Sequence, residues 1–283
     1  MSARRRRVSA ATVFFFGLSL ALGIALYLKS RPSPAPSPRH TAAPSPSPVV
    51  SPSPHRPAAP PAASARIAII IDDLGNDRAA VELLAGWREP VACAVLPMLP
   101  GSVAAAETLS RSGKEVLLHL PMEPKGFPGV RPGPGLVLVS QTDAEIRSTL
   151  AEDLDSVPHA TGVNNHMGSL ATADRRVMQV VAGELARRGL FFVDSRTTEL
   201  TVAVEAAVRA RVPSASRRVF LDDVQTVEAV ERSLDDLVAK AKAEGSAIAI
   251  GHPHPVTLEV LGRELPRIGE RRVRLVRVSE LVR

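Results

Sequence analysis

The chain has 283 residues, of which 45% are hydrophobic and 23% are charged, as in ordinary globular proteins. Its net charge of +6 is unevenly distributed, because residues 1–65 hold eight of the 35 basic residues and none of the 29 acidic ones. Residues 66–283 therefore have a net charge of −2, which argues against nucleic-acid binding by a basic face. The single cysteine, Cys93, excludes an intrachain disulfide and a zinc site of cysteine ligands.

Residues 1–30 have the pattern of a membrane anchor. Residues 8–28 carry no charge, and as a helix they would span about 31 Å, enough to cross a bilayer. Four arginines precede this run, so the positive-inside rule places the N-terminus in the cytoplasm. A cleaved signal peptide is the alternative, although no small-residue cleavage site follows the run. We therefore expect a single-pass protein of the inner (cytoplasmic) membrane whose folded domain is periplasmic or otherwise extracytoplasmic.

Residues 31–65 contain 12 of the 25 prolines, mixed with serine and alanine. Such a segment cannot bury enough apolar surface to fold and tends towards extended polyproline II. The sequence therefore predicts three parts: a membrane anchor over residues 1–30, a disordered Pro/Ser/Ala-rich linker over 31–65, and a folded domain over 66–283.

Short β-rich apolar runs alternate with helical patterns through the folded domain. The runs cover residues 66–73, 91–97, 114–122, 161–166, 189–194, 218–223, 247–252 and 273–278. Helical periodicity covers 174–188 and 224–244, and Thr142 with Glu145 forms a capping-box pattern that opens a helix through about residue 154. This alternation predicts a parallel sheet in a distorted (β/α) barrel of about seven strands. An open doubly wound sheet is the main alternative, but no Gly-x-Gly-x-x-Gly motif follows the first strand.

Polar residues gather at one end of the predicted strands. Four of the domain's five histidines lie at or just after a strand end: His119, His166, His252 and His254. Carboxylates in the same kind of position are Asp72, Asp73, Asp194, Asp222 and Asp223. In parallel α/β folds the carboxyl ends of the strands form the edge where ligands bind. The sequence therefore predicts a functional site there.

These residue types favour a metal-dependent hydrolase. Two neutral imidazoles and one carboxylate form a common zinc site, and a second carboxylate can take a proton from a water molecule that the metal activates. Asp72 and Asp73 are adjacent in a strand, so we expect their side chains to point in different directions, one to a metal and one to water. At least one of His252 and His254 is expected in the site. Asp194 and Asp222 could orient imidazoles or bind a substrate hydroxyl.

Nucleophilic serine catalysis is the rival chemistry. It lacks the Gly-x-Ser-x-Gly elbow that would expose a nucleophile, and Ser169 and Ser195 are weak candidates.

Six motifs in this order resemble those of the divergent polysaccharide deacetylases, a branch of the NodB-like carbohydrate esterases: IDDLG, HLPMEP, NNHMGS, FVDSRT, FLDD and GHPHP. The resemblance covers about residues 66–280. It implies a distorted (β/α) barrel, a divalent metal (most often zinc) and an N-acetylated polysaccharide substrate such as peptidoglycan. By resemblance, Asp72 is the catalytic base, Asp73 a metal ligand, His252 the general acid and Asp194 the carboxylate that orients a site histidine.

One position departs from the better-known deacetylases, which hold their metal with a His-x-x-x-His motif. Glu123 stands four residues after His119, so the second imidazole has to come from another strand, and His166 is the best choice.

Two hypotheses follow. In the first, an envelope-anchored enzyme binds Zn²⁺ through Asp73, His119 and His166, and its substrate-binding residues are Asn165, Asp222 and His254. In the second, a catalytically inactive protein keeps the barrel to bind a glycan or a protein. The altered ligand spacing and the low aromatic content, 3%, favour the second.

Overall fold

The computed structural model describes residues 65–283, which contain nine β-strands in a single parallel sheet. The strands are β1 (Ala65–Leu74), β2 (Ala92–Val95), β3 (Glu115–Met122), β4 (Gly162–Met167), β5 (Phe191–Asp194), β6 (Ser214–Ser216), β7 (Val219–Phe220), β8 (Ser246–Gly251) and β9 (Val273–Leu275). The predicted anchor and linker lie outside the described residues. Among residues 65–283, no helix is long and apolar enough to cross a membrane.

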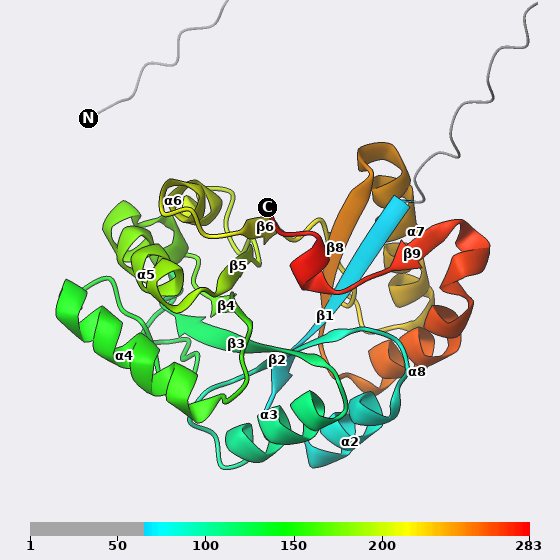
Figure 1. The fold of residues 1–283 in the computed structure, drawn as a ribbon, viewed down its shortest axis with the longest axis horizontal. Coiled ribbons are helices and arrows are strands. Elements are labelled where there is room, and N and C mark those ends of the chain that lie inside the picture. The colour runs from blue at the N-terminus through cyan, green and yellow to red at the C-terminus, as the bar shows by residue number, and fades with distance from the viewer. Residues whose placement is uncertain (1–64) are drawn as a thin grey trace, which may run out of the picture. The chain divides into compact units, whose positions relative to one another are not determined.

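The central strand is β1, and the strand order is β6-β5-β4-β3-β2-β1-β8-β7. On one edge β1 pairs with β8, from Arg66 opposite Ser246 to Ile71 opposite Gly251. On the other edge its first residues pair with β9 and its last residues with β2. The amino-terminal part of β1, the first strand of the domain, therefore lies between β8 and β9, two strands from the end of the chain (Figure 1).

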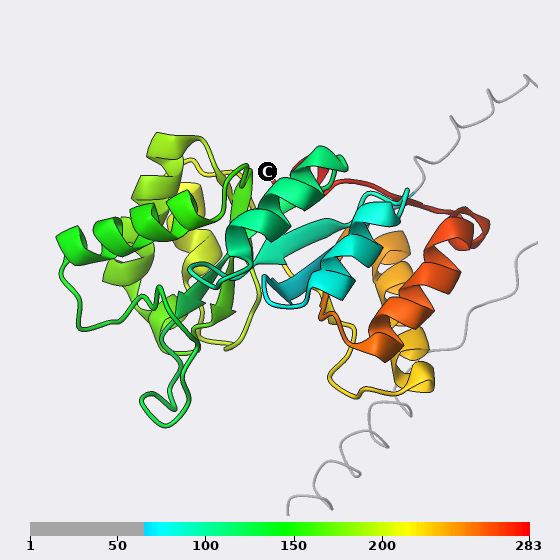
Figure 2. The ribbon, with the colours of Figure 1, turned by 90° about the horizontal axis from the view of Figure 1, so that it is seen from below.

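Seven α-helices connect the strands. They are α2 (Arg78–Gly86), α3 (Ser102–Arg111), α4 (Asp143–Ser156), α5 (Arg175–Arg188), α6 (Ala203–Arg209), α7 (Val227–Glu244) and α8 (Pro255–Glu264), followed by a 3₁₀ turn at Leu265–Arg271. Figure 2 shows α4, α3, α2 and α8 side by side along the sheet. Local signals set their starts, because Asp174 accepts a hydrogen bond from Val177 N–H and the Thr142–Glu145 capping box forms as predicted.

The two faces of the sheet are covered differently. The larger core cluster joins the outer face of the strands to residues of the helices. The smaller cluster lies on the inner face and contains strand residues together with Val276, Val278 and Leu281, but no residue of α2–α8. Because the helices cover one face, the doubly wound alternative, which needs helices on both, is excluded for this domain.

The sheet curls but is open between β6 and β7. Arg217 N–H donates to the Asp194 carbonyl (2.9 Å), whereas Arg218 N–H donates to the Ile248 carbonyl (2.8 Å). A single peptide therefore passes from the edge at β5 to the edge at β8. The prediction of a distorted parallel barrel is confirmed in its coarser form, as a curled half-barrel.

Residues 276–283 cross the inner face at the amino ends of the strands. Val278 N–H donates to the buried Glu115 carboxylate (2.8 Å). Beyond it, Arg283 and Ser214 of β6 exchange two backbone hydrogen bonds of 2.9 and 3.2 Å. This C-terminal segment therefore connects β1 with β6 and completes the inner core.

All eight predicted strands are present, although the run at 218–223 supplies only the two-residue strand β7. Strand β6 was not predicted, because its sequence, Ser-Ala-Ser, has no alternation of apolar and polar residues. The predicted helix at 174–188 is α5, and the helix predicted from 224 begins at Val227, after the N-cap Thr226.

Val278→Ala should lower the free energy of unfolding by about 2 kcal/mol, because it removes buried methyl groups from the inner core. Val278 is fully buried, whereas Val282 is only partly buried. Urea unfolding of both alanine variants would measure the difference, and equal losses would contradict this role of the C-terminal segment.

Asp153 of α4 predicts a pH-dependent stability. Its side chain is buried and neither carboxylate oxygen has a hydrogen-bond partner. Burial, with a smaller effect of the neighbouring Glu152 charge, raises the pKa of Asp153 to about 8. The folded chain thus holds this proton more tightly than the unfolded chain, so stability present at acid pH is lost as the pH rises from about 4 to about 8.

Asp153→Asn should therefore remove much of this loss and stabilise the protein at pH 8 by on the order of 3 kcal/mol. Asp155→Asn, at an exposed position of the same helix, is the control. Denaturant unfolding at acid and alkaline pH would test the prediction, which fails if wild type and Asp153→Asn show the same pH dependence.

Candidate metal centre

The alternation of side chains along each strand decides which polar residues reach the inner face. In β1, β3 and β8, the residues two positions before Asp72, His119 and His252 belong to the inner core cluster. These three polar residues therefore share that face. In β4, Asn164 and His166 have the same orientation, whereas Val163, the residue before Asn164, joins the outer cluster. Five polar side chains thus converge on the inner face at the carboxyl ends of the strands.

Asp73 joins them by a break in the strand. Regular alternation would turn Asp73 outward, but its φ is +57°, in the left-handed region, and the register with β2 shifts between Ile71 and Leu74. Such a conformation costs on the order of 1 kcal/mol for a residue other than glycine. The prediction that the two carboxylates diverge is wrong, because Asp72 Oδ2 and Asp73 Oδ1 lie 3.5 and 3.2 Å from the same atom, His119 Nε2.

Three potential ligand atoms meet around one point. Asp73 Oδ1 lies 3.0 Å from His166 Nδ1, and His166 Nδ1 lies 3.1 Å from His119 Nε2. Asp73 Oδ1 is buried, yet neither imidazole approaches it with hydrogen-bond geometry. This is the pattern expected of donor atoms arranged around a cation, and two nitrogens with one oxygen suit zinc. The residues therefore fit a divalent metal.

The electrostatics agree with a charged ligand set. Burial raises the pKa of the Asp73 carboxyl, but the imidazoles of His119 and His166 outweigh burial and hold this pKa well below its usual range. Asp73 is therefore a carboxylate with both oxygens able to accept a cation or a hydrogen bond.

Asn164 fixes the tautomer of His119. Its Oδ1 lies 3.0 Å from His119 Nδ1, so Nδ1 carries the proton and the Nε2 lone pair faces Asp73. The amide nitrogen of Asn164 donates to Asp72 Oδ1 (2.8 Å). One buried amide therefore orients both a metal-ligand candidate and the neighbouring carboxylate. Sequence reasoning assigned Asn164 no role, although it lies two residues before His166 and so on the same face.

Asp72 is the buried carboxylate of the site, only 2% exposed. Burial raises the pKa of Asp72, although His119 and the hydrogen bond from Asn164 oppose this effect. A carboxylate with a raised pKa accepts a proton more readily, which is the property a general base requires.

His252 is oriented by Asp222. Asp222 Oδ1 accepts from His252 Nδ1 (3.0 Å), while Oδ2 accepts from His252 N–H (2.6 Å) and the Thr257 hydroxyl (2.8 Å). The Nε2 atom of His252 is left to face Asp73 Oδ2, at 3.8 Å. Burial lowers the pKa of His252, but Asp222 and the other carboxylates outweigh burial and raise it.

The structure distinguishes the two histidines of the last motif. His254 Nε2 lies 3.0 Å from the Gln225 side chain, and its ring centre is 5.7 Å from that of His252. His252 is the one that contacts the carboxylates of the site. Asp222, His252 and His254 form a second group of potential metal ligands, but Asp222 and His252 are already hydrogen-bonded to each other.

Two predicted site residues, Asp194 and Asn165, point away from the site. Asp194 has the outward orientation of Phe192, and it accepts hydrogen bonds from Arg196 N–H and the Thr201 hydroxyl. The prediction that Asp194 orients a site histidine is therefore wrong, and Asp222 has that role. Asn165 also points outward and binds the backbone of Ser195 and Met167.

Asp222 itself was predicted to bind substrate. It is buried and its oxygens accept hydrogen bonds from His252 and Thr257, so the substrate-binding role is corrected. The other role expected for Asp222, orienting an imidazole, is the one that the structure shows. The errors about Asp194 and Asn165 have one cause. Successive side chains of a strand point to opposite faces, and the sequence did not show which of them point to the inner face.

Glu123, four residues after His119, forms hydrogen bonds with the backbone and not with the imidazoles. Its Oε2 accepts from Val139 N–H (2.7 Å), and its carbonyl accepts from Leu170 and Ala171 N–H, 3.0 Å each. The residue therefore holds the segment between β3 and α4 against the loop after β4, and the imidazole beside Asp73 and His119 is that of His166.

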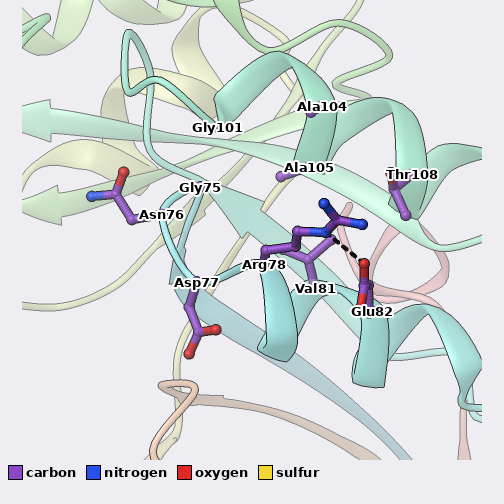
Figure 3. Close-up of a pocket in the computed structure, with 10 residues that line it drawn as sticks. All are labelled: Gly75, Asn76, Asp77, Arg78, Val81, Glu82, Gly101, Ala104, Ala105 and Thr108. Atoms are coloured by element: carbon purple, nitrogen blue, oxygen red, sulfur yellow. Dashed lines mark hydrogen bonds and ion pairs between the residues drawn. The ribbon is translucent and has the colours of Figure 1, made fainter.

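A cavity of about 340 Å³ lies between α2 and α3, beside the loop that follows Asp73 (Figure 3). Arg78 and Glu82 pair at its side (2.7 Å). None of the imidazoles and carboxylates of the candidate metal centre lines this cavity. It is lined by Gly75, Asn76, Asp77, Arg78, Val81, Glu82, Gly101, Ala104, Ala105 and Thr108.

The fold and the site define a class: curled parallel α/β half-barrels with carboxylates and imidazoles gathered at the carboxyl ends of the strands. Residues 69–282 match the family model of divergent polysaccharide deacetylases. The chain therefore belongs to that family, and the resemblance inferred from the six motifs is confirmed.

Two curated bacterial proteins and one solved structure are similar to this chain. The chain is 35% identical over 208 residues to an uncharacterized protein of Haemophilus influenzae, covering 74% of each. It is 36% identical over 201 residues to the uncharacterized protein YibQ of Escherichia coli, covering 71% of this chain and 62% of that one. The crystal structure of an uncharacterized protein from Agrobacterium tumefaciens superimposes with a TM-score of 0.74 at 26% identity, covering 79% of this chain and 91% of that chain.

Proposed function

We propose that this chain is a metal-dependent hydrolase that removes acetyl groups from an N-acetylated polysaccharide. The observation that carries the proposal is the convergence of Asp73, His119 and His166 on one point, within 3.2 Å of one another. A buried carboxylate and a hydrogen-bonded imidazole stand beside that point, so acid and base are both within reach of one substrate bond.

Asp73, His119 and His166 would hold the metal, and zinc suits this donor set best. Such a cation, when bound, polarises the amide carbonyl and lowers the pKa of a water molecule. Asn164 supports this arrangement from behind by keeping the His119 Nε2 lone pair turned toward the site.

The remaining residues supply the proton transfers. Asp72 takes a proton from the attacking water as the water oxygen forms a bond with the carbonyl carbon of the acetyl group. His252, whose Nδ1 is hydrogen-bonded to Asp222 and whose pKa the neighbouring carboxylates raise, gives a proton to the amide nitrogen as the carbon–nitrogen bond breaks. The products are acetate and the free amine of the sugar. Asp72 then releases its proton and His252 takes one up, so both residues return to their starting states.

We expect the purified protein to release acetate from an N-acetylated glycan, to stop when a chelator is added, and to resume when zinc is returned. Chromatographic detection of acetate across a panel of such glycans, peptidoglycan included, would test this. A protein that binds zinc but releases no acetate from any of them would contradict the proposal.

That negative result would support a second function, in which the family fold serves to bind a glycan or a protein without catalysis. Two observations favour this alternative. Glu123 is hydrogen-bonded to the backbone at the position of the usual ligand. Among residues 65–283, the ring pairs of the site histidines include one phenylalanine, Phe220, whose ring centre is 5.2 Å from that of His252, and no tyrosine or tryptophan. Sugar-binding sites commonly offer several aromatic faces.

The N-terminal sequence supports a location for this activity. The uncharged run at 8–28 would anchor the chain in the cytoplasmic membrane with residues 66–283 on the outer side. Peptidoglycan is an N-acetylated polysaccharide accessible from that side. His254, at the start of α8 and near His252, would contact such a chain.

A further inference from the structure

The site lies at the carboxyl ends of the strands, and the opposite edge of the sheet is rich in basic side chains, although the net charge of residues 66–283 is only −2. Because each helix runs back along a parallel strand, the helices end near the opposite edge, at the amino ends of the strands. Basic residues in the last turns of the helices therefore gather at that edge: Arg111, Arg187, Arg188, Arg209, Lys242, Arg263 and Arg271.

Five further arginines form what we call the basal patch: Arg66, Arg267, Arg272, Arg274 and Arg277. None of them belongs to an ion pair among the described residues, whereas Arg263 and Arg271 nearby are both paired with carboxylates. All except Arg66 are exposed, and Arg66 is half-buried.

Strand pairing and hydrogen bonds bring three of these arginines together, Arg66, Arg274 and Arg277. Arg66 of β1 lies directly opposite Arg274 of β9 in the sheet. The Arg66 guanidinium donates to the Glu280 carbonyl (3.3 Å), and Arg277 begins the turn that contains Glu280. Two carboxylates, Glu270 and Glu280, lie in the same segments, so positive charge prevails.

Stabilisation of helix dipoles does not account for this patch. Basic residues are favoured in the last turn of a helix, but Arg66 and Arg274 lie in strands. Arginines placed side by side in adjacent strands repel each other, so their position favours an external anionic partner.

We propose that the basal patch docks onto the surface of an anionic phospholipid bilayer. Clusters of basic residues bind such surfaces electrostatically. The chain enters the domain at Ala65, next to Arg66 of the patch, and residues 29–64, which follow the predicted membrane span, hold four basic side chains and no acidic one. The positive charge of the patch therefore continues into the segment that is predicted to lead to the membrane.

This docking would orient the site. The patch lies at the amino end of β1 and Asp73 near its carboxyl end, and a strand of 10 residues spans roughly 30 Å at about 3.3 Å per residue. The carboxylates and imidazoles would then face away from the bilayer, towards material outside it.

The test uses residues 65–283, since every described strand pairing and both core clusters lie within them. Arg267, Arg272 and Arg274 would be changed together to glutamine. A matched control changes Arg131, Arg147 and Arg232, which are equally exposed, also without an ion pair, and far from the amino ends of the strands. Both variants lose the same charge, and circular dichroism would confirm that both fold.

Co-sedimentation would be measured with vesicles of phosphatidylcholine containing phosphatidylglycerol and with vesicles of phosphatidylcholine alone. We expect the wild type and the control to bind the anionic vesicles in a salt-sensitive manner. The basal variant should bind at least about tenfold more weakly, because each arginine near an anionic surface contributes about fivefold in affinity.

Absence of wild-type binding, equal binding to neutral vesicles, or equal loss in both variants would overturn the proposal. Binding to soluble dextran sulfate but not to anionic vesicles would also overturn it, in favour of an acidic polymer. None of these measurements depends on hydrolase activity, so failure of the proposed function would leave the result intact.

Discussion

Asp72→Asn should reduce acetate release by roughly 10²–10⁴-fold, the usual contribution of a positioned general base, while the metal stays bound. Asparagine has nearly the same shape as aspartate, and its carbonyl oxygen can still accept the hydrogen bond that Asn164 donates to Asp72 Oδ1. It cannot take a proton from water. The chemical step should therefore fail although the site remains assembled.

The measurement is kcat for acetate release, accompanied by the zinc content of each protein. Asp155→Asn, at an exposed position of α4, should match the wild type in both. If Asp72→Asn retains the wild-type rate, Asp72 is not the base. If it loses both rate and zinc, Asp72 belongs to the ligand set instead.

His166→Ala should weaken zinc binding by more than about 100-fold, because loss of a direct ligand exceeds the 10- to 100-fold effect typical of the residues behind the ligands. The remaining pair, Asp73 and His119, leaves the cation one protein ligand short. His159→Ala removes an imidazole from an exposed position outside the site, and so makes a matched control.

Calorimetric titration with zinc of the metal-free protein would compare these variants. We expect one strong site in the wild type and in His159→Ala, and none in His166→Ala. Retained strong binding in His166→Ala would contradict the ligand set and would direct attention to the group of Asp222, His252 and His254.

The fold was largely predictable because strands and helices alternate in the sequence and each strand is a short apolar run. Strands buried on both faces, however, contain apolar residues at nearly every position. Their alternation therefore does not reveal which face is inner. For that reason the sequence located the edge where the site lies but could not exclude Asp194 or Asn165, which point outward.

The other features of the site depend on backbone conformation and on contacts between distant residues, which the sequence pattern does not show. Asp73 reaches the site only through a left-handed backbone conformation, which is unusual for aspartate although less so than for most residues. Asn164 was not predicted as a site residue, because an asparagine near a histidine is a weaker sign of a metal centre than the histidine itself. The pairing of His252 with Asp222 joins residues 30 positions apart, and only the meeting of β7 and β8 in space brings them together.

The central position of β1 bears on how the chain reaches this structure. Arg66 pairs with Ser246 and Ala65 with Val273, so the middle of the sheet joins the two ends of the domain in sequence. Such high contact order slows folding. A nascent or exported chain lacking β8 and β9 would expose the edge of an almost entirely apolar strand, a hazard for aggregation. We expect premature truncation before residue 246 to yield insoluble protein, and the cell's holding chaperones to recognise Ile67–Ile71.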